Sequence, residues 1–189
     1  MMSNQFLSEL IEIPENYRKV SKTNEKRNNQ TVEIRRYQVA GEYTYNGPRI
    51  IEVVGSGKLI SLKNLTTVPV GRLLTAEKAQ ILAVQLFAKA HPAYAKGLSF
   101  IRIEQQERSF WDVEGKLQTF PVQWVKFAHQ NGSYNWVTLG ATGVLIELEI
   151  DSRWDYFRGR RKTEMWDNDD WVLAREGKGP QLASPNALA

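Results

Sequence analysis

The spacing of apolar residues predicts one long helix and a series of short strands. Within residues 76–90, apolar side chains recur every three or four positions and form a single stripe, the pattern of an amphipathic helix lying on a sheet. Thr75 is a good N-cap ahead of this stripe, and His91-Pro92 ends it. We therefore expect a helix over residues 76–90.

Alternation of apolar and polar residues, bounded by turn residues, predicts the strands. The candidates are 32–39, 50–54, 58–63, 98–105, 122–129, 134–139 and 144–150. Gly55-Ser56-Gly57 and Asn131-Gly132 have the composition of tight turns, since glycine adopts positive φ at little cost. The polar segment 21–31 predicts a loop, and the polar residues 112–116 predict a long connection.

A six-residue pattern occurs twice in the chain. Gly57-Lys58-Leu59-Ile60-Ser61-Leu62 and Gly143-Val144-Leu145-Ile146-Glu147-Leu148 share the form Gly-x-Leu-Ile-x-Leu. In each copy a strand candidate precedes the glycine, and a helix candidate begins the unit. One shared hexapeptide can arise by chance, but the shared order of elements favours a duplicated unit.

The second unit carries a resemblance to a known family. Its order of helix, strand, strand, glycine turn and strand, opened by Thr75-Ala76-Glu77-Lys78-Ala79, resembles a PepSY-type domain, and Ala141-Thr142-Gly143-Val144-Leu145 is similar to that family's closing hairpin. With Ile13-Pro14-Glu15-Asn16-Tyr17 leading into the first copy, the tandem units resemble the repeated PepSY-related domains of Firmicute proteins. The first unit, about 13–63, has only Gly55-Ser56-Gly57 where the family has a Thr-Gly turn.

The resemblance implies a bacterial protein with a cystatin-like helix-on-sheet fold. It also implies non-catalytic roles, such as peptidase inhibition, propeptide-like chaperoning or protein binding near the cell envelope. The fold class that we expect is α+β, with two cystatin-like or PepSY-like units of helix and antiparallel sheet in tandem. Residues 1–66 would form a degenerate first unit, 67–174 a second unit with an aromatic and basic extension, and 175–189 a flexible tail.

Composition excludes some classes of chemistry and of partner. The chain has no cysteine, which excludes disulfides, thiolate chemistry and cysteine-based zinc sites. Its 25 basic residues are interspersed with 21 acidic ones, and this mixing argues against a nucleic-acid partner. The N-terminal residues lack the apolar run of a signal peptide, and no stretch approaches the roughly 20 apolar residues of a membrane span. The sequence as given therefore predicts a cytoplasmic protein; a leader removed from it would leave an envelope location open.

Few residues are candidates for catalysis or metal binding. A Ser-His-Asp or histidine-metal site would have to use His91 or His129, and both positions favour structural or solvated roles. Asp167, Asp169 and Asp170 do not form a calcium loop, because its sixth position is Val172 where glycine is required. We therefore expect no catalytic residue, no metal site and no cofactor.

Residues 154–162 are the segment that we expect to face a partner. They combine aromatic and basic side chains: Trp154, Tyr156, Phe157, Arg158, Arg160, Arg161 and Lys162. Such a mixture can hold single-stranded nucleic acid through phosphate contacts and base stacking. Alternatively, the aromatic residues cover the sheet while the basic ones pair with Glu164, Asp167, Asp169 and Asp170.

A second group of residues could line a small-molecule pocket between helix and sheet, or else sit in the core. Its members are Trp124, His129, Tyr134 and Trp136. The leading functional hypothesis is a non-enzymatic module that binds a protein or peptide, in a peptidase-regulatory role or another, through an exposed strand edge. A small-molecule carrier or an enzyme using this pocket is the first alternative, and single-stranded nucleic-acid binding is the second. The sequence does not identify the partner and leaves a homodimer open.

Overall fold

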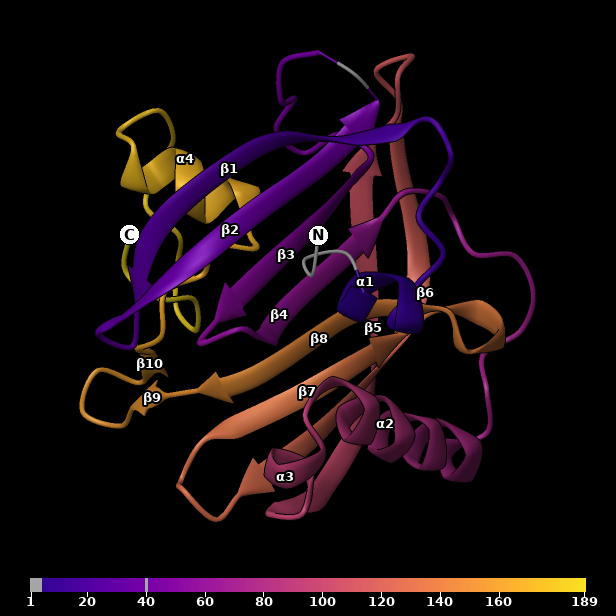
Figure 1. Ribbon diagram of the computed structural model, residues 1–189, viewed down its shortest axis with the longest axis vertical. Coiled ribbons are helices and arrows are strands. Elements are labelled where there is room, and N and C mark those ends of the chain that lie inside the picture. Colours follow the sequence, from indigo (N-terminus) through magenta and orange to yellow (C-terminus); the bar gives the residue numbers. More distant parts are fainter. Residues whose placement is uncertain (1–4, 40) are drawn as a thin grey trace.

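A single antiparallel sheet of eight strands is the main feature of the fold (Figure 1). The computed structural model describes residues 5–39 and 41–189, and their side chains from residue 7 onward. The strand order is β1-β2-β3-β4-β8-β7-β6-β5, so each half of the chain forms a four-stranded meander and the two meanders join through β4 and β8.

The strands of the sheet are β1 (Tyr17–Arg27), β2 (Gln30–Val39), β3 (Arg49–Gly55), β4 (Lys58–Leu65), β5 (Leu98–Trp111), β6 (Leu117–His129), β7 (Tyr134–Leu139) and β8 (Leu145–Ser152). A separate small ribbon consists of β9 (Trp154–Asp155) and β10 (Arg160–Arg161). The helices are α1 (Gln5–Leu10), α2 (Ala76–Ala90), α3 (Pro92–Ala95) and α4 (Asp169–Arg175), with a 3₁₀ turn at Ala141–Gly143. No helix in the described ranges is long and apolar enough to cross a membrane.

The expected fold class, two helix-plus-sheet units in tandem, is wrong. The strands of both expected units belong to one continuous sheet, and α2 is the only helix of more than seven residues among those described. The fold is therefore mainly β and does not have the expected cystatin-like architecture. The physical reason is that β4 and β8 would each be an unpaired edge in a separate unit, and here they pair with each other. The domain limits 1–66, 67–174 and 175–189 stay predictions.

Two of the three hydrophobic clusters among the described residues cover opposite faces of the sheet. On one face, α1 and α2 pack against β6, β7 and β8 through residues such as Leu7, Phe87 and Phe127. On the other face, α4 and the C-terminal segment pack against β2 and β3, with Trp166 and Trp171 in the interface. Figure 1 shows α2 in front of the sheet and α4 behind β1 and β2. Among the described residues, none from β5, β6 or β7 belongs to this second cluster.

The predicted helix over residues 76–90 is confirmed by α2. The Thr75 side chain accepts a hydrogen bond from the backbone N–H of Lys78 and caps the first turn. The apolar stripe is buried: Ala79, Ala83, Leu86, Phe87 and Ala90. Phe87 meets Phe127 of β6 edge to face, with ring centroids 5.3 Å apart.

The loop expected over residues 21–31 is wrong, because these residues form most of β1, the turn at Asn28 and Asn29, and the start of β2. Asn28 and Asn29 turn the chain with φ values of 50° and 63°, the left-handed pair of a type I′ turn. β1 is an edge strand whose side chains are mostly exposed, so its sequence is polar without apolar alternation.

The long connection expected around residues 112–116 is also wrong. β5 continues to Trp111 and β6 begins at Leu117, so these residues form a tight turn in which Gly115 has a φ of 78°. The turns predicted at Gly55-Ser56-Gly57 and Asn131-Gly132 are confirmed, and they connect β3 to β4 and β6 to β7.

The C-terminal residues lie along the β9–β10 ribbon. The backbone N–H of Arg161 donates to the carbonyl of Pro185 over 2.8 Å, and the Arg160 guanidinium donates to the carbonyls of Leu182 and Asn186. Ala187 is buried against the layer that contains Trp166. Arg160 and Arg161 thus hold this segment beside the sheet.

Candidate binding site

A cavity of about 580 Å³ lies on the sheet face opposite α2. Its floor consists of side chains from β5, β6, β7 and β8 and of Lys63 from β4, and residues from the segment 152–168 with Pro185 and Asn186 form its wall. Along β6, Trp124 and Lys126 face the cavity, while the alternate residues Val125 and Phe127 pack in the core beneath α2. Period-two alternation therefore separates the cavity from the core.

Aromatic rings and cations are interleaved on the floor of the cavity. Trp124 and Trp136 lie with ring centroids 5.6 Å apart. The Lys126 ammonium lies 4.2 Å from the ring centroid of Tyr134 and 5.2 Å from that of Trp124, and the Arg161 guanidinium lies 5.3 Å from that of Trp136. Each cation lies within the range of a cation–π contact.

Lys126 is the cation of the floor that lacks an anionic partner. Its ammonium makes no hydrogen bond or ion pair with any residue in the described part of the chain. Burial and the nearby Arg102 lower the pKa of Lys126, and Glu104 offsets this shift only in part. Aromatic ring faces lie close to this half-buried ammonium, so the binding of an anion next to it would stabilise its charge.

Glu147, by contrast, is saturated with donors. Lys63 Nζ lies 3.0 Å from its carboxylate, Arg108 binds both oxygens over 2.8 and 2.9 Å, and the Thr138 hydroxyl donates over 2.6 Å. Burial raises the pKa of Glu147, but Lys63, Arg108 and the hydrogen bond from Thr138 together bring it below its usual range. Glu147 is therefore a fixed carboxylate that neutralises part of the positive charge of Lys63 and Arg108 on the floor.

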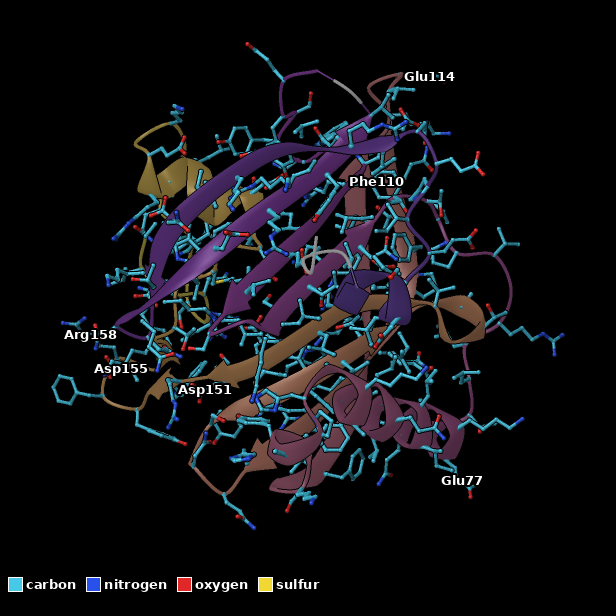
Figure 2. All side chains as sticks on the ribbon, in the orientation of Figure 1. Glu77, Phe110, Glu114, Asp151, Asp155 and Arg158 are labelled. Atoms are coloured by element: carbon cyan, nitrogen blue, oxygen red, sulfur yellow. The ribbon has the colours of Figure 1, made fainter. Side chains whose placement is uncertain are left out.

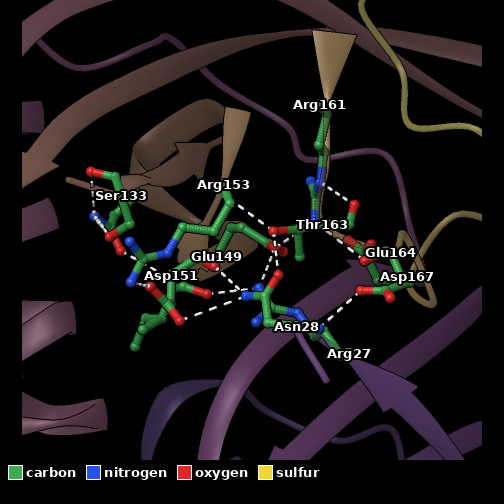
Figure 3. A network of polar contacts seen from close by, with 12 residues as sticks. Arg27, Asn28, Ser133, Glu149, Asp151, Arg153, Arg161, Thr163, Glu164 and Asp167 are labelled. Carbon is green, nitrogen blue, oxygen red and sulfur yellow. Dashed lines mark hydrogen bonds and ion pairs between the residues drawn. The ribbon is translucent and has the colours of Figure 1, made fainter. Parts of the chain in front are cut away.

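A second buried carboxylate, Glu149, faces two arginines (Figure 3). Its Oε1 atom accepts from Arg27 over 2.7 Å and from Arg161 over 2.5 Å, and the residue is 1% exposed. Its Oε2 atom is buried without a hydrogen-bond partner in the described residues. One negative charge between two guanidiniums leaves this end of the cavity positive.

The structure places three of the four predicted pocket residues at this cavity. Trp124, Tyr134 and Trp136 line it, but on the face away from α2 and not between helix and sheet. His129 does not line it: its ring stacks on Tyr94 with centroids 3.9 Å apart, and its Nε2 atom lies 3.1 Å from the Tyr94 carbonyl oxygen. His129 is an odd-numbered residue on a strand whose even-numbered side chains face the cavity, so the alternation itself signals this difference.

The predicted partner-facing segment divides into internal and exposed residues. Trp154 lines the cavity, while Arg160 and Arg161 bind the C-terminal carbonyls and Glu149. Tyr156 and Phe157 stand at the tip of the β9–β10 ribbon, where Phe157 is 99% exposed. Figure 2 shows Asp155 and Arg158 at this projecting tip.

The basic run therefore does not form one surface. Lys162 is exposed, and the Arg158 guanidinium lies 3.9 Å from the Asp155 carboxylate. The pairing expected with Glu164, Asp167, Asp169 and Asp170 differs from the observed one. Arg161 pairs with Glu149, whereas Asp169 is bound by Arg49 over 3.0 Å. Of the four basic residues of this run, Arg158 and Lys162 are exposed to a partner, whereas Arg160 is half-buried and Arg161 is buried.

The other titratable candidates have local partners. His91 Nδ1 accepts from the backbone N–H of Tyr94 and caps α3. Asp169, the first residue of α4, is fully buried and also accepts from the Tyr43 hydroxyl over 2.9 Å. Within residues 5–39 and 41–189, no group of three or more His, Asp or Glu residues is arranged to hold a metal ion.

Several residues that line the cavity are not among the pocket residues predicted from the sequence. Lys126 carries a usable signal, because it lies two positions from Trp124 on the same strand and so shares its face. Arg102, Arg108 and Glu147 carry none, because only the strand order and register bring them to this face.

No protein-family model, curated protein or solved structure matches this chain. The resemblance to PepSY-type domains therefore stays a prediction that rests on the motifs at residues 75–79 and 141–145.

Proposed function

We propose that this chain is a non-enzymatic binding protein that holds a small molecule in the cavity on the β5–β8 face. The observation that carries the proposal is an open volume of about 580 Å³. Trp124 and Trp136 lie on its floor, and the unpaired ammonium of Lys126 lies beside the Trp124 ring. Pockets for small molecules have volumes of roughly 300–1,000 Å³, with mainly apolar walls and a few polar groups.

The state of the titratable groups supports binding without catalysis. A general acid or base needs a pKa near the working pH and a free path to the substrate. Four donor atoms hold Glu147, and the pKa of this residue is lowered. His129 packs on the opposite face of the sheet against Tyr94.

Indole N–H signals in a ¹⁵N correlation spectrum test this proposal. The chain has six tryptophans, and Trp124, Trp136 and Trp154 belong to the cavity, whereas Trp111, Trp166 and Trp171 do not. We expect fragment-sized compounds that bind to shift the first three signals selectively, with assignments made by single Trp→Phe substitutions. A fragment library in which no compound shifts the three cavity signals selectively would refute the proposal.

A second candidate is peptide binding at the free edge of β5. This strand has β6 as its one neighbour, and it exposes Phe100 and Ile101 near its start. An extended peptide could add to such an edge through backbone hydrogen bonds. Peptides selected from a displayed library should lose binding with Ile101→Lys and keep it with Phe157→Ser on the distant ribbon. Equal binding by both variants would count against the β5 edge.

A further inference from the structure

We infer that the ligand of this cavity is a flat anion, with a carboxylate, sulfonate or phosphate beside Lys126 and a conjugated ring against the two tryptophans of the floor. The inference rests on the proposed function and deepens it by naming the ligand class. It follows from three features of the cavity: an unpaired cation, carboxylates that are already paired, and two neighbouring indole rings on the floor.

The unpaired cation defines where the anion would lie. Lys126 is directly paired across the strands with Trp136 on one side and with Arg102 on the other. Arg102 contributes a second positive charge at the rim, where it is half-exposed and paired with Glu104 over 2.5 Å. An anion next to Lys126 would form a charge-assisted hydrogen bond in a partly desolvated site, where such bonds are stronger than in bulk water.

The carboxylates of the cavity argue against a cationic ligand. Of the described carboxylates that line it, Glu147 is bound by Lys63 and Arg108, Glu104 is paired with Arg102, and Asp167 lies 3.6 Å from Lys63 Nζ. Each of these anions therefore already faces at least one positive charge. A cationic ligand would find no free carboxylate among them, and it would meet Lys126 at close range.

The indole rings of the floor favour a ligand with a conjugated ring. The Trp124 and Trp136 rings lie with centroids 5.6 Å apart and planes inclined by 49°, with Lys126 near the Trp124 ring and Arg161 near the Trp136 ring. A molecule whose anionic group binds Lys126 can therefore place its apolar part against an indole ring of the floor. Flat conjugated groups gain the most from such walls, because aromatic contacts add to the burial of apolar area.

Three naphthalene probes of different charge test the inference: 2-naphthoate, 2-naphthamide and 2-naphthylmethylammonium. We expect 2-naphthoate to bind about tenfold more tightly than the neutral amide, and the cation to bind most weakly. Lys126→Met should lower the affinity for 2-naphthoate about tenfold and leave that for 2-naphthamide unchanged. Lys126→Arg should keep the preference. Lys89→Met, which removes the same charge from the exposed surface of α2, should not alter it.

The outcomes separate this inference from the proposed function. If the neutral amide or the ammonium binds as tightly as 2-naphthoate, the cavity binds small molecules but not by charge, and only the inference fails. If Lys126→Met and Lys89→Met weaken 2-naphthoate equally, the preference arises from net charge, and the assignment to Lys126 fails. If library fragments shift the cavity indole signals but none of the three naphthalenes does, the cavity does not bind conjugated rings against the tryptophans. The inference then fails while the proposed function stands. If no fragment shifts them, the proposed function fails as well.

Discussion

Leu62 and Leu148 are direct partners across β4 and β8 at the centre of the sheet, and each is the last residue of its copy of the repeated hexapeptide. On either side of them, Ser61 pairs with Glu149 and Lys63 pairs with Glu147. Ser61 and Glu147 hold the same position in the two copies, so an approximate twofold axis through the leucine pair exchanges these pairings. The repeat thus joins the two halves of the chain.

The two halves share backbone pairing but differ in what covers them. On the face opposite α2, the first half is covered by α4 and the C-terminal segment through Trp166 and Trp171. The second half carries Trp124, Lys126 and Trp136 on the same face and is left open as the cavity. A pairing scheme that is nearly symmetric therefore carries a binding site in one half only.

Removal of the Glu149 carboxylate should destabilise the protein strongly. Glu149→Ala leaves the buried guanidiniums of Arg27 and Arg161 without their shared anion, and breaking a buried ion pair in this way costs about 3–5 kcal/mol. Urea unfolding followed by circular dichroism measures the change. Glu104→Ala is the control, because the exposed Arg102–Glu104 pair contributes about 0–1 kcal/mol. Similar losses in both variants would show that the Glu149 network does not anchor the fold.

The stability of the protein should fall with acid through Glu147. The pKa of Glu147 is lowered in the folded protein from an ordinary value of 4.5, so the folded state binds the proton less readily than the unfolded state. The stabilisation is complete above the unfolded pKa and is lost as the pH falls through the lower folded pKa. We expect Glu147→Gln to be less stable at pH 7 and to show a shallower decline below about pH 4.5.

The matched control for the acid series is Glu114→Gln, on the exposed β5–β6 turn (Figure 2). Its unfolding free energy should follow that of the unmodified protein from pH 7 down to pH 3. An acid decline in Glu147→Gln as steep as that of the unmodified protein would mean that other groups carry the pH dependence.

The sequence predicts those elements whose apolar residues follow the burial of the element along its whole length. α2 shows its apolar stripe and cap because one face of this helix is buried along its whole length. The strands at 134–139 and 144–150 are predictable from their short apolar runs, because both of their faces are largely buried. β1 is not predictable, because its edge position exposes most of its side chains and removes the apolar signal.

The sequence could not predict the joining of the two halves or most of the cavity. The two hexapeptides indicate a repeat. However, the residues of β4 and β8 do not reveal that these two strands pair with each other and join the two halves in one sheet. Trp124, Tyr134 and Trp136 could be grouped because they are aromatic residues on adjacent predicted strands. Arg108 and Glu147 meet only after β5 and β8 are placed in one sheet, so their contact depends on tertiary structure.

Glycine at the second position of the β1–β2 turn should stabilise the protein. Asn29 has a φ of 63° in a type I′ turn, for which Asn-Gly is the favoured pair, so Asn29→Gly should add up to about 1 kcal/mol. Chemical unfolding measures this gain. Gln30→Gly, one residue later in β2, should instead lose about 0.5–1 kcal/mol. A loss in both variants would contradict the turn type.

Gly97 and His129 should show strong energetic coupling. A Cβ atom at Gly97 would clash with His129 Nε2, so Gly97→Ala must displace a ring that is stacked on Tyr94. We expect this substitution to cost about 1–3 kcal/mol in the unmodified protein and much less in a His129→Ala background. Gly47→Ala is the control, because its nearest neighbour, the Thr44 carbonyl oxygen, would lie at 3.4 Å.

The same two variants separate the structural role of His129 from a role in binding. His129 stacks on Tyr94 of α3, whereas Lys126 and Trp136 lie on the opposite face of the sheet. His129→Ala should therefore lower the free energy of unfolding and change the affinity for 2-naphthoate by no more than about twofold. Unfolding curves and probe titrations on one preparation give both quantities. Loss of probe affinity without loss of stability would place His129 in the binding site. An equal cost of Gly97→Ala in both backgrounds would show that the imidazole ring is not what excludes a side chain at residue 97.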